Sequence, residues 1–308
     1  MGLFRRRVSA SFACKRVSLH SSGLRIALAT CGEFATLDAD DRLLLEPLRV
    51  LGVESLPAVW DDRLVDWSSF DAVLLRSTWD YPIRVAQFMA WAATLPVLFN
   101  PIQLVRWNVD KRYLLELELD GLPIVPTRFA GPGEAHDIPL EWIEIVVKPS
   151  ISVGSRDTAR YRRDDPQAAR HIARLQAAGR TAMVQPYLDG VERSGETSLV
   201  YLDGNFSHAI RKGPLLQPGG IMTAELFAPE DITPRIPSGA ELDLGAQVLG
   251  AVTGRFGTPL YARIDLLPGP VLIEVELIEP SLFLGHGPGS MDRLAGAIVA
   301  ALSSVSPH

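Results

Sequence analysis

Cysteine is scarce in this sequence, which has only Cys14 and Cys31 among 308 residues. Two cysteines provide neither a disulfide framework nor a cysteine-rich metal cluster. We therefore expect a protein of a reducing compartment, with the cytoplasm as the default. Long apolar runs are also lacking, because no segment approaches the roughly 20 residues needed to span a bilayer. We expect no membrane partner.

Basic residues are outnumbered, with 30 Lys and Arg against 36 Asp and Glu and a formal net charge of −6. Five of the basic residues fall in the first 23 positions, which contain no acidic residue. The remainder is therefore more acidic still, which argues against nucleic acid as a partner. Residues 1–23 resemble a transit peptide in composition, or a tail added by an upstream start codon. We predict a basic, disordered N-terminal extension.

Apolar strand patterns alternate with helical patterns in the segment that follows. Strands are indicated at 24–29, 53–60, 70–75 and 97–99, and helical spacing at 40–51 and 88–93. Strands separated by helices and short loops are typical of a parallel sheet covered on both faces. At 308 residues the chain has room for two or three lobes. We assign residues 24–105 to an N-terminal α/β domain.

A polar and aromatic loop, RSTWDYP at 76–82, follows the third strand of this domain. Ligands of open parallel sheets bind beyond the carboxyl ends of the strands. Arg76 can pair with a carboxylate and Asp80 with an amine, so Arg76, Ser77, Asp80 and Tyr81 are candidate substrate contacts. The alternative is a structural turn in which Trp79 packs inward and Asp80 caps the next helix.

Two lysines mark the middle of the chain. Lys111 falls in the first turn of a helix predicted over 108–121, where a cation is mildly disfavoured unless an anion lies nearby. Lys148 ends a strand predicted over 144–149. The small, hydroxyl-rich loop at 150–156 follows, and its backbone N–H groups can cradle phosphates. The loop lacks the G-x-x-x-x-G-K-[ST] pattern, which excludes a P-loop protein.

An acidic hairpin, YARIDLLPGPVLIEVELIEP at 261–280, contains the most informative pattern. Glu274 and Glu276 share one face of a strand because side chains alternate. A four-residue loop, 268–271, would set Asp265 opposite Glu274, whereas a three-residue loop would put Asp265 on the wrong face. Three crowded carboxylates would be resolved by a magnesium ion. The alternative is a solvent-facing acidic strand. Alternation places Glu279 on the opposite face, so we leave it outside the site.

In order, these motifs resemble the ATP-grasp ligases. The matching pieces span about residues 105–285 and read NVDK at 108–111, VVKP at 146–149, VQPYL at 184–188, GETS at 195–198, RK at 211–212, RID at 263–265 and EVE at 274–276. Three segments, RSTWDY, WNVDKRYL and EVELIEPSLFL, most resemble the sequences of an actinobacterial-type group of these ligases. That group includes the enzyme that closes O-ureido-D-serine to D-cycloserine. The second glutamate of EVE departs from the Glu-x-Asn of many such ligases, which leaves the metal-ligand set open.

The resemblance implies an α/β ATP-grasp fold, in which an N-terminal parallel α/β lobe precedes two α+β lobes that clasp ATP. Residues 106–184 would form the lid and residues 185–308 the C-terminal subdomain with the metal site. The implied ATP contacts are Lys111, Lys148, Ser152, Gly154, Ser155, the hinge residues Gln185, Pro186, Tyr187 and Leu188, and Glu196 at the ribose. Asp265, Glu274 and Glu276 would bind one or two Mg²⁺ ions, for which Mn²⁺ can substitute, and Arg211 and Lys212 would stabilise the transferred phosphoryl group.

The implied chemistry converts a carboxylate of a small amino-acid-like substrate into an acyl phosphate, which an amine-type nitrogen then attacks. Three alternatives stay open at this point. The nucleophile belongs to the same molecule, as in the cyclising enzyme; it belongs to a second amino acid, as in dipeptide or glutathione synthesis; or the chain is a non-catalytic ATP-binding module. A homodimer, common in the family, is a further expectation.

Overall fold

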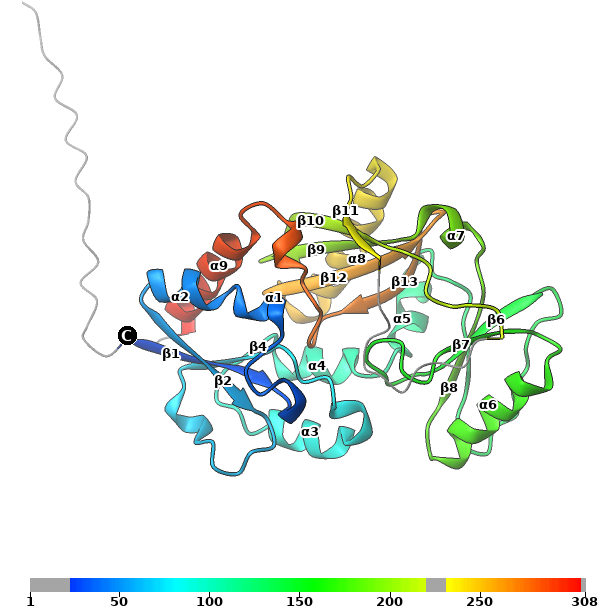
Figure 1. The fold of residues 1–308 in the computed structure, drawn as a ribbon, viewed down its shortest axis with the longest axis horizontal. Helices are drawn as coiled ribbons and strands as arrows, with labels where there is room; N and C mark the ends of the chain where they lie inside the picture. Colours follow the sequence, from blue (N-terminus) through cyan, green and yellow to red (C-terminus); the bar gives the residue numbers. More distant parts are fainter. Residues whose placement is uncertain (1–22, 220–230, 306–308) are drawn as a thin grey trace, which may run out of the picture.

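The computed structural model describes residues 23–219 and 231–305. It has the expected mixed α/β fold, with three sheets (Figure 1). The predicted N-terminal extension lies outside the described residues, apart from Gly23. None of the helices in the described ranges is long and apolar enough to cross a membrane.

The first sheet is parallel and has the strand order β2-β1-β3-β4. Its strands are β1 (Leu24–Thr30), β2 (Val53–Val59), β3 (Ala72–Leu75) and β4 (Leu98–Phe99), and the helices between them are α1 (Ala39–Arg42), α2 (Leu45–Val50) and α3 (Val85–Ala92). The single helix predicted over 40–51 is divided into α1 and α2. Pro47 has no N–H for an intrahelical bond, so it is tolerated only in the first turn of a new helix.

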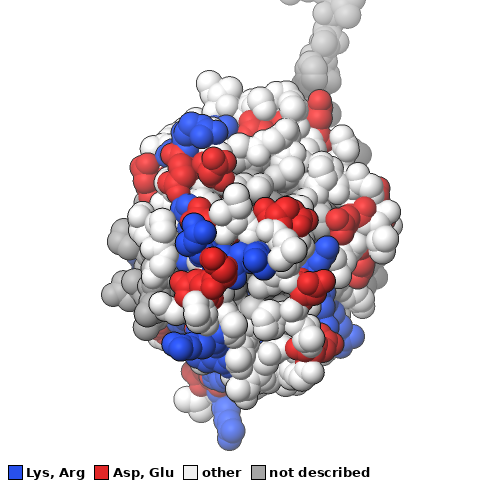
Figure 2. Space-filling view, turned by 90° about the vertical axis from the view of Figure 1, so that its right-hand side faces the viewer, with Lys and Arg blue, Asp and Glu red and all other residues white. Residues whose placement is uncertain are grey.

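The second sheet is antiparallel, with the order β5-β8-β6-β7, and we call it the lid sheet. It contains β5 (Arg128–Ala130), β6 (Glu144–Pro149), β7 (Ala159–Arg162) and β8 (Ala182–Pro186), and α6 (Pro166–Ala177) packs against it. Asp165 caps α6 by accepting a hydrogen bond from the N–H of Gln167, and Pro166 occupies the first helical position. Viewed from the lid side, basic and acidic side chains are interspersed over the surface (Figure 2).

The third sheet is also antiparallel, with the order β11-β10-β9-β12-β13, and we call it the C-terminal sheet. Its strands are β9 (Glu196–Leu202), β10 (Asn205–Lys212), β11 (Ile232–Pro234), β12 (Tyr261–Leu267) and β13 (Val271–Glu276). The helix α8 (Gly239–Phe256) begins with a reciprocal capping box between Ser238 and Glu241 and packs its apolar side on this sheet. Short elements complete the fold, namely α7 (Gly190–Ser194) and 3₁₀ turns at Gly32–Phe34, Trp67–Ser69, Tyr81–Ile83 and Leu284–His286.

Two helical segments pack against a part of the fold other than the one predicted from their position in the chain. The helices α4 (Ile102–Asn108) and α5 (Tyr113–Leu119) share an apolar core with the C-terminal sheet and α8, although they precede the lid sheet in the chain. The last helix, α9 (Ser290–Val305), lies beside α2 and shares a core with β1 and β3 (Figure 1). The domain limits at 105, 184 and 308 remain a prediction.

The helix predicted over 108–121 is also divided, and the division places Lys111. Asn108 ends α4 instead of capping a helix, and Lys111 lies in the turn before α5. The Asn108 side chain donates to the carbonyl of Val275 at 2.8 Å and accepts from the N–H of Leu277 at 2.9 Å. The Tyr113 hydroxyl lies 2.9 Å from the Val275 carbonyl and 2.8 Å from its N–H. The α4–α5 junction therefore fixes the backbone of β13.

Candidate active site

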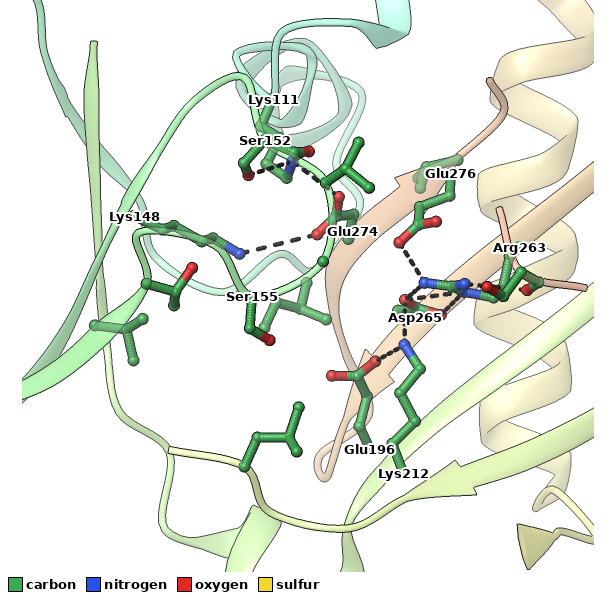
Figure 3. Close-up of a pocket in the computed structure, with 18 of the residues that line it drawn as sticks. Lys111, Lys148, Ser152, Ser155, Glu196, Lys212, Arg263, Asp265, Glu274 and Glu276 are labelled. Carbon is green, nitrogen blue, oxygen red and sulfur yellow. Dashed lines mark hydrogen bonds and ion pairs between the residues drawn. The ribbon is translucent and has the colours of Figure 1, made fainter. Parts of the chain in front are cut away.

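A cavity of about 430 Å³ lies where three parts of the fold meet. They are the lid sheet, the C-terminal sheet and the N-terminal α/β part with the first sheet, which we call the first lobe. The lid sheet contributes Val146, Lys148, Gln185 and Pro186 to its wall. The C-terminal sheet contributes a set of six ionisable side chains that we call the charged face (Figure 3). Its members are Glu196 from β9, Lys212 from β10, Arg263 and Asp265 from β12, and Glu274 and Glu276 from β13.

The strand register brings the charged face together. Lys212 pairs with Glu196 across β9 and β10, and Arg263 pairs with Glu276 across β12 and β13. Residues two apart on one strand project to the same side, so Arg263 and Asp265 share a face. Opposite charges thus lie next to each other on neighbouring strands, an arrangement that stabilises a sheet.

Asp265 lies opposite Glu274, as predicted, but the loop that produces this pairing differs from the expected one. Leu267 pairs with Val271, which leaves a three-residue connection of 268–270. A shift in register between Asp265 and Leu266 then restores the pairing of Asp265 with Glu274. Such a bulge inserts one extra residue and reverses the face of every side chain beyond it. The predicted four-residue loop was therefore wrong, while the facing carboxylates were right.

Asp265 is the centre of the charged face and is 2% exposed. Its carboxylate accepts hydrogen bonds from Lys212 Nζ at 2.9 Å and from Arg263 Nη2 at 2.9 Å. Burial alone would raise the pKa of Asp265, but the adjacent Arg263 and Lys212 hold it well below its usual range. Lys212 also donates to Glu196 at 2.7 Å.

Glu276 bonds to Arg263 at the edge of the same network. Burial raises the pKa of Glu276 to about 7, even though the neighbouring guanidinium opposes the shift. Glu274, on the same face of β13, lies next to the two lysines predicted from the sequence. Its carboxylate lies 3.0 Å from Lys111 Nζ and 4.0 Å from Lys148 Nζ.

The two lysines differ in how firmly they are held. Lys111 Nζ also donates to the carbonyl of Ser152 at 3.0 Å and to its hydroxyl at 3.2 Å. Lys148 makes no contact closer than its 4.0 Å approach to Glu274 among the ion pairs of the described residues. Burial lowers the pKa of Lys148, since its ammonium has lost water without gaining a close anion. An anionic ligand in the cavity would give the Lys148 ammonium group the close counter-ion that it lacks.

The remaining wall of the cavity is formed by the loop after β6 and by the chain after β8. Ser152, Val153, Gly154 and Ser155 line it from the loop, with Gly154 at a positive φ of 59°. Pro186, Tyr187 and Leu188 line it from the segment that leads from the lid sheet to α7. Arg160 of β7 stacks on the Tyr187 ring at 3.5 Å and pairs with Glu144 and Glu192, which ties this segment to the lid.

Comparison with known proteins identifies this arrangement. Residues 26–100 match the family model described as the N-terminal domain of D-cycloserine synthetase DcsG. The chain is 36% identical over 296 residues to the cycloserine biosynthesis protein DcsG of Streptomyces lavendulae, covering 90% of this chain and 98% of the relative. The crystal structure of D-cycloserine synthetase DcsG superposes with a TM-score of 0.84 at 36% identity, over 90% of this chain and 99% of that one.

This chain belongs to the DcsG group of ATP-grasp ligases. More distant structures share the fold of this ligase. One is a D-alanine–D-alanine ligase from Bacillus anthracis in complex with ATP, with a TM-score of 0.60, 16% identity and coverage of 92% of this chain and 98% of that one. Another is the ATP-grasp ligase PsnB with a minimal precursor, Mg and ADP, with a TM-score of 0.58, 18% identity and coverage of 92% and 100%. These structures show the fold, whereas membership of the DcsG group shows that the chain is an ATP-dependent ligase that forms carbon–nitrogen bonds.

Most of the residues singled out in the sequence line the cavity of this ligase. They are Tyr81, Lys111, Lys148, Ser152, Gly154, Ser155, Gln185, Pro186, Tyr187, Leu188, Glu196, Lys212, Asp265, Glu274 and Glu276. Gln185 is 2% exposed and donates to the Thr127 hydroxyl at 3.0 Å, so its side chain braces the strand. Its backbone pairs with Val146 inside the lid sheet.

Three of the four substrate contacts predicted in the loop at 76–82 do not line the cavity. Arg76 is 2% exposed and pairs with Asp41 at 2.7 Å, and Ser77 donates to the same carboxylate at 2.6 Å. Asp80 accepts from Trp60 Nε1 at 2.7 Å and pairs with Arg84. The structure therefore favours the alternative of a structural turn, although Asp80 makes no side-chain cap. Sequence alone gave no sign of Asp41, the buried partner that draws Arg76 inward.

Arg211 is another correction, because it projects away from the charged face. Alternation along β10 sends Lys212 into the cavity and Arg211 to the other side. There Arg211 donates to the carbonyl of Ser194 and pairs with Asp231, both at 3.1 Å. The cation that joins Lys212 is Arg263, which sequence reasoning missed. The signal was present, since Arg263 stands two residues before Asp265 on the same strand.

Glu279 was also placed outside the site, and the structure moves it to the wall of the cavity. The prediction extended strand alternation through Glu279, but β13 ends at Glu276 and the chain turns after it. Alternation holds only while the backbone stays extended. Glu279 is 8% exposed.

The expected crowding of carboxylates is absent as well. Among the residues that the structure describes, no three histidine, cysteine, aspartate or glutamate side chains are grouped closely enough to hold a metal ion by themselves. Arg263 and Lys212 separate and neutralise the carboxylates that were expected to need a cation. Mg²⁺ commonly uses one or two carboxylates together with substrate phosphates. Glu274 and Glu276, two residues apart on one face, fit that requirement.

Proposed function

We propose that this ligase activates the carboxylate of a small amino-acid-like substrate as an acyl phosphate, and that a nitrogen of the same molecule then attacks. The nitrogen lone pair forms the new C–N bond, the acyl C–O bond to phosphate breaks, and the nitrogen loses a proton. ADP and phosphate are the other products. The observation that carries the proposal is the charged face beside two lysines in one cavity, within a chain 36% identical to DcsG.

The nucleotide would lie between the lid sheet and the charged face. Its phosphates would meet Lys111, Lys148 and the N–H groups of the loop at 152–155, and its base would lie against the chain at 185–188. Glu196, at the start of β9, would bind the ribose hydroxyls. Phosphoryl transfer requires mainly positioning and charge neutralisation, and these residue types supply both.

Mg²⁺ would bind Glu274 and Glu276, with Asp265 as a third candidate ligand. Phosphate charge would compete with Glu274 for Lys111 and Lys148. The freed carboxylate would then be available to the metal. Once bound, the ion would neutralise phosphate charge, while Arg263 and Lys212 would stabilise the transferred group from the protein side.

Ring closure of O-ureido-D-serine is the specific reaction that we favour. The relative that shares 36% of its residues with this chain is described as a cycloserine biosynthesis protein, and both proteins are covered almost completely. The competing reaction is ligation of two separate amino acids.

ADP release distinguishes these reactions. We expect O-ureido-D-serine alone, with ATP and Mg²⁺, to give ADP and a cyclised product. Mass spectrometry should detect it as the substrate minus one water, which still contains the carbamoyl group, or as D-cycloserine once water has removed that group as CO₂ and NH₃. If ADP release requires a second amino acid, the reaction is intermolecular. If none of a panel of carboxylates and amines yields ADP, the proposal is wrong in its substrate class.

A further inference from the structure

The end of the cavity next to the first lobe is aromatic, and Glu279 contributes a carboxyl group to it. Trp79 and Tyr81 line it from the turn after β3, and Glu279 and Phe283 line it from the chain after β13. Trp79 Nε1 donates to the carbonyl of Glu279 at 3.0 Å. The Tyr81 hydroxyl lies close enough to the Glu279 carboxyl to oppose the rise of its pKa. Two side chains of the first lobe therefore hold Glu279 in place.

Glu279 differs from the carboxylates of the charged face because it has no counter-ion. Glu196, Asp265, Glu274 and Glu276 each pair with lysine or arginine. Within the described part of the chain no ion pair includes Glu279, and its Oε2 is buried without a hydrogen-bond partner. Burial, reinforced by the charge of Glu276, raises the pKa of Glu279 to about 8. Lys111, the cation whose charge reaches Glu279, is already bonded to Ser152 and Glu274.

A buried polar group that lacks a partner destabilises the fold unless a ligand satisfies it. A buried carboxyl next to Tyr81 and without a counter-ion suits one class of ligand, a compact cation with N–H donors. Asp38 is the carboxylate that the first lobe itself contributes to the cavity, but it caps α1 by accepting from the N–H of Asp40 at 2.9 Å. Glu279 has the freer acceptor of the two.

We propose that Glu279 is the specificity-determining residue that binds the amino group of the substrate, with Tyr81 orienting its carboxyl. This inference deepens the proposed function and rests on it, because it names which end of the amino-acid-like substrate faces the first lobe. The substrate carboxylate would then point toward the nucleotide, and its ammonium would lie between Glu279 and the aromatic rings. Glu279 thereby selects amino acids over the corresponding acids without the amine.

Matched ligand pairs test the inference through binding. O-Ureido-D-serine, D-serine and D-alanine are each compared with the same compound lacking the amino group, by calorimetric titration into the full-length enzyme with ADP and Mg²⁺. We expect the wild-type protein to bind the amino member of a pair roughly ten- to a hundredfold more tightly, the scale of one charged hydrogen bond. Glu279→Gln should reduce this preference to about twofold, while ADP affinity stays unchanged.

Three further variants test this measurement, one for a partial effect and two as controls. Tyr81→Phe keeps the ring and removes the hydroxyl, so it should weaken the preference only partly. Glu118→Gln, a matched change on the exposed side of α5, should leave it intact. Asp38→Asn should also leave the preference in place, because its carboxylate serves α1.

The outcomes separate the inference from the proposed function. Discrimination that depends on Glu279, without ADP release from any substrate, would support the amine site and overturn the proposed reaction. ADP release by a Glu279→Gln enzyme that still prefers amines would overturn the amine site alone. The inference is equally wrong if Asp38→Asn, and not Glu279→Gln, removes the preference. It is also wrong if wild-type protein fails to distinguish the members of any pair, a comparison that needs no variant to fold.

Discussion

The lid sheet and the C-terminal sheet border the same cavity with opposite kinds of surface. From its strands the lid sheet presents Lys148 as the one charged lining residue, next to Val146, Gln185 and Pro186. The C-terminal sheet presents the six ionisable side chains of the charged face, and all of them except Glu274 are joined to one another by ion pairs across four neighbouring strands. Figure 3 shows this asymmetry, because a single dashed line, to Glu274, reaches Lys148, whereas Asp265 is bonded to both Arg263 and Lys212.

The difference assigns separate tasks to the two sheets. A charge that already has partners is costly to remove, because its partners stay buried and unpaired. A charge without a close partner is free to act on a ligand. The C-terminal sheet is therefore a fixed electrostatic framework, whereas the lid sheet contributes an apolar cover and a lysine available to an anion.

The largest effect should follow from breaking the framework at its centre. Asp265→Asn removes the shared partner of Arg263 and Lys212, and Glu274→Gln removes the carboxylate nearest the lysines. We expect each variant to lower the rate of ADP release by at least about a hundredfold, the scale of losing a charged transition-state contact. Excess Mg²⁺ should partly restore activity. Asp243→Asn, on the exposed side of α8, is the control. Wild-type turnover of either variant at limiting Mg²⁺ would show that the charged face does not act on the metal or the phosphates.

An intermediate effect should distinguish the two cavity lysines of these sheets. Lys148→Met should weaken ATP binding by about tenfold or more and leave the melting temperature of the ATP-free protein unchanged or higher, because burial already disfavours this ammonium. Lys212→Met should lower the melting temperature, because Glu196 and Asp265 lose a shared partner. Calorimetric melting and ATP titration of both variants measure the contrast. Equal destabilisation by the two changes would remove the distinction between the sheets.

The smallest effect concerns the core beneath the lid. His171 of α6 is 6% exposed, its Nδ1 lies 3.2 Å from the Tyr161 hydroxyl, and burial lowers its pKa to about 4. The unfolded chain takes up a proton near pH 6.5 and the folded chain does not, so stability is lost as pH falls from about 6.5 toward 4. We expect the melting temperature to fall by a few degrees less between pH 7 and pH 5 in His171→Gln than in wild type. Identical pH dependence in the two proteins would mean that His171 does not titrate in this window. Carboxyl groups elsewhere titrate alike in both proteins and cancel.

Local patterns were sufficient for much of the site. The strand predicted over 144–149 has the limits of β6, and it brings Lys148 to the cavity wall. The face shared by Glu274 and Glu276 follows from strand geometry alone. These features depend on neighbours in the chain, and a strand pattern records them directly. The motif order was enough to identify the ATP-grasp group, which the relatives confirm.

Other features depend on partners distant in sequence, and only the tertiary structure decided them. Arg76 turns into the core because Asp41, 35 residues away, meets it there. A bulge beside Asp265, invisible in an apolar pattern, keeps it opposite Glu274 despite a three-residue loop. Glu279 reaches the cavity because β13 ends and the first lobe holds the chain that follows. Sequence thus determined which residue types were available on each strand, whereas long-range pairing decided which of them are neutralised and which are left to meet a ligand.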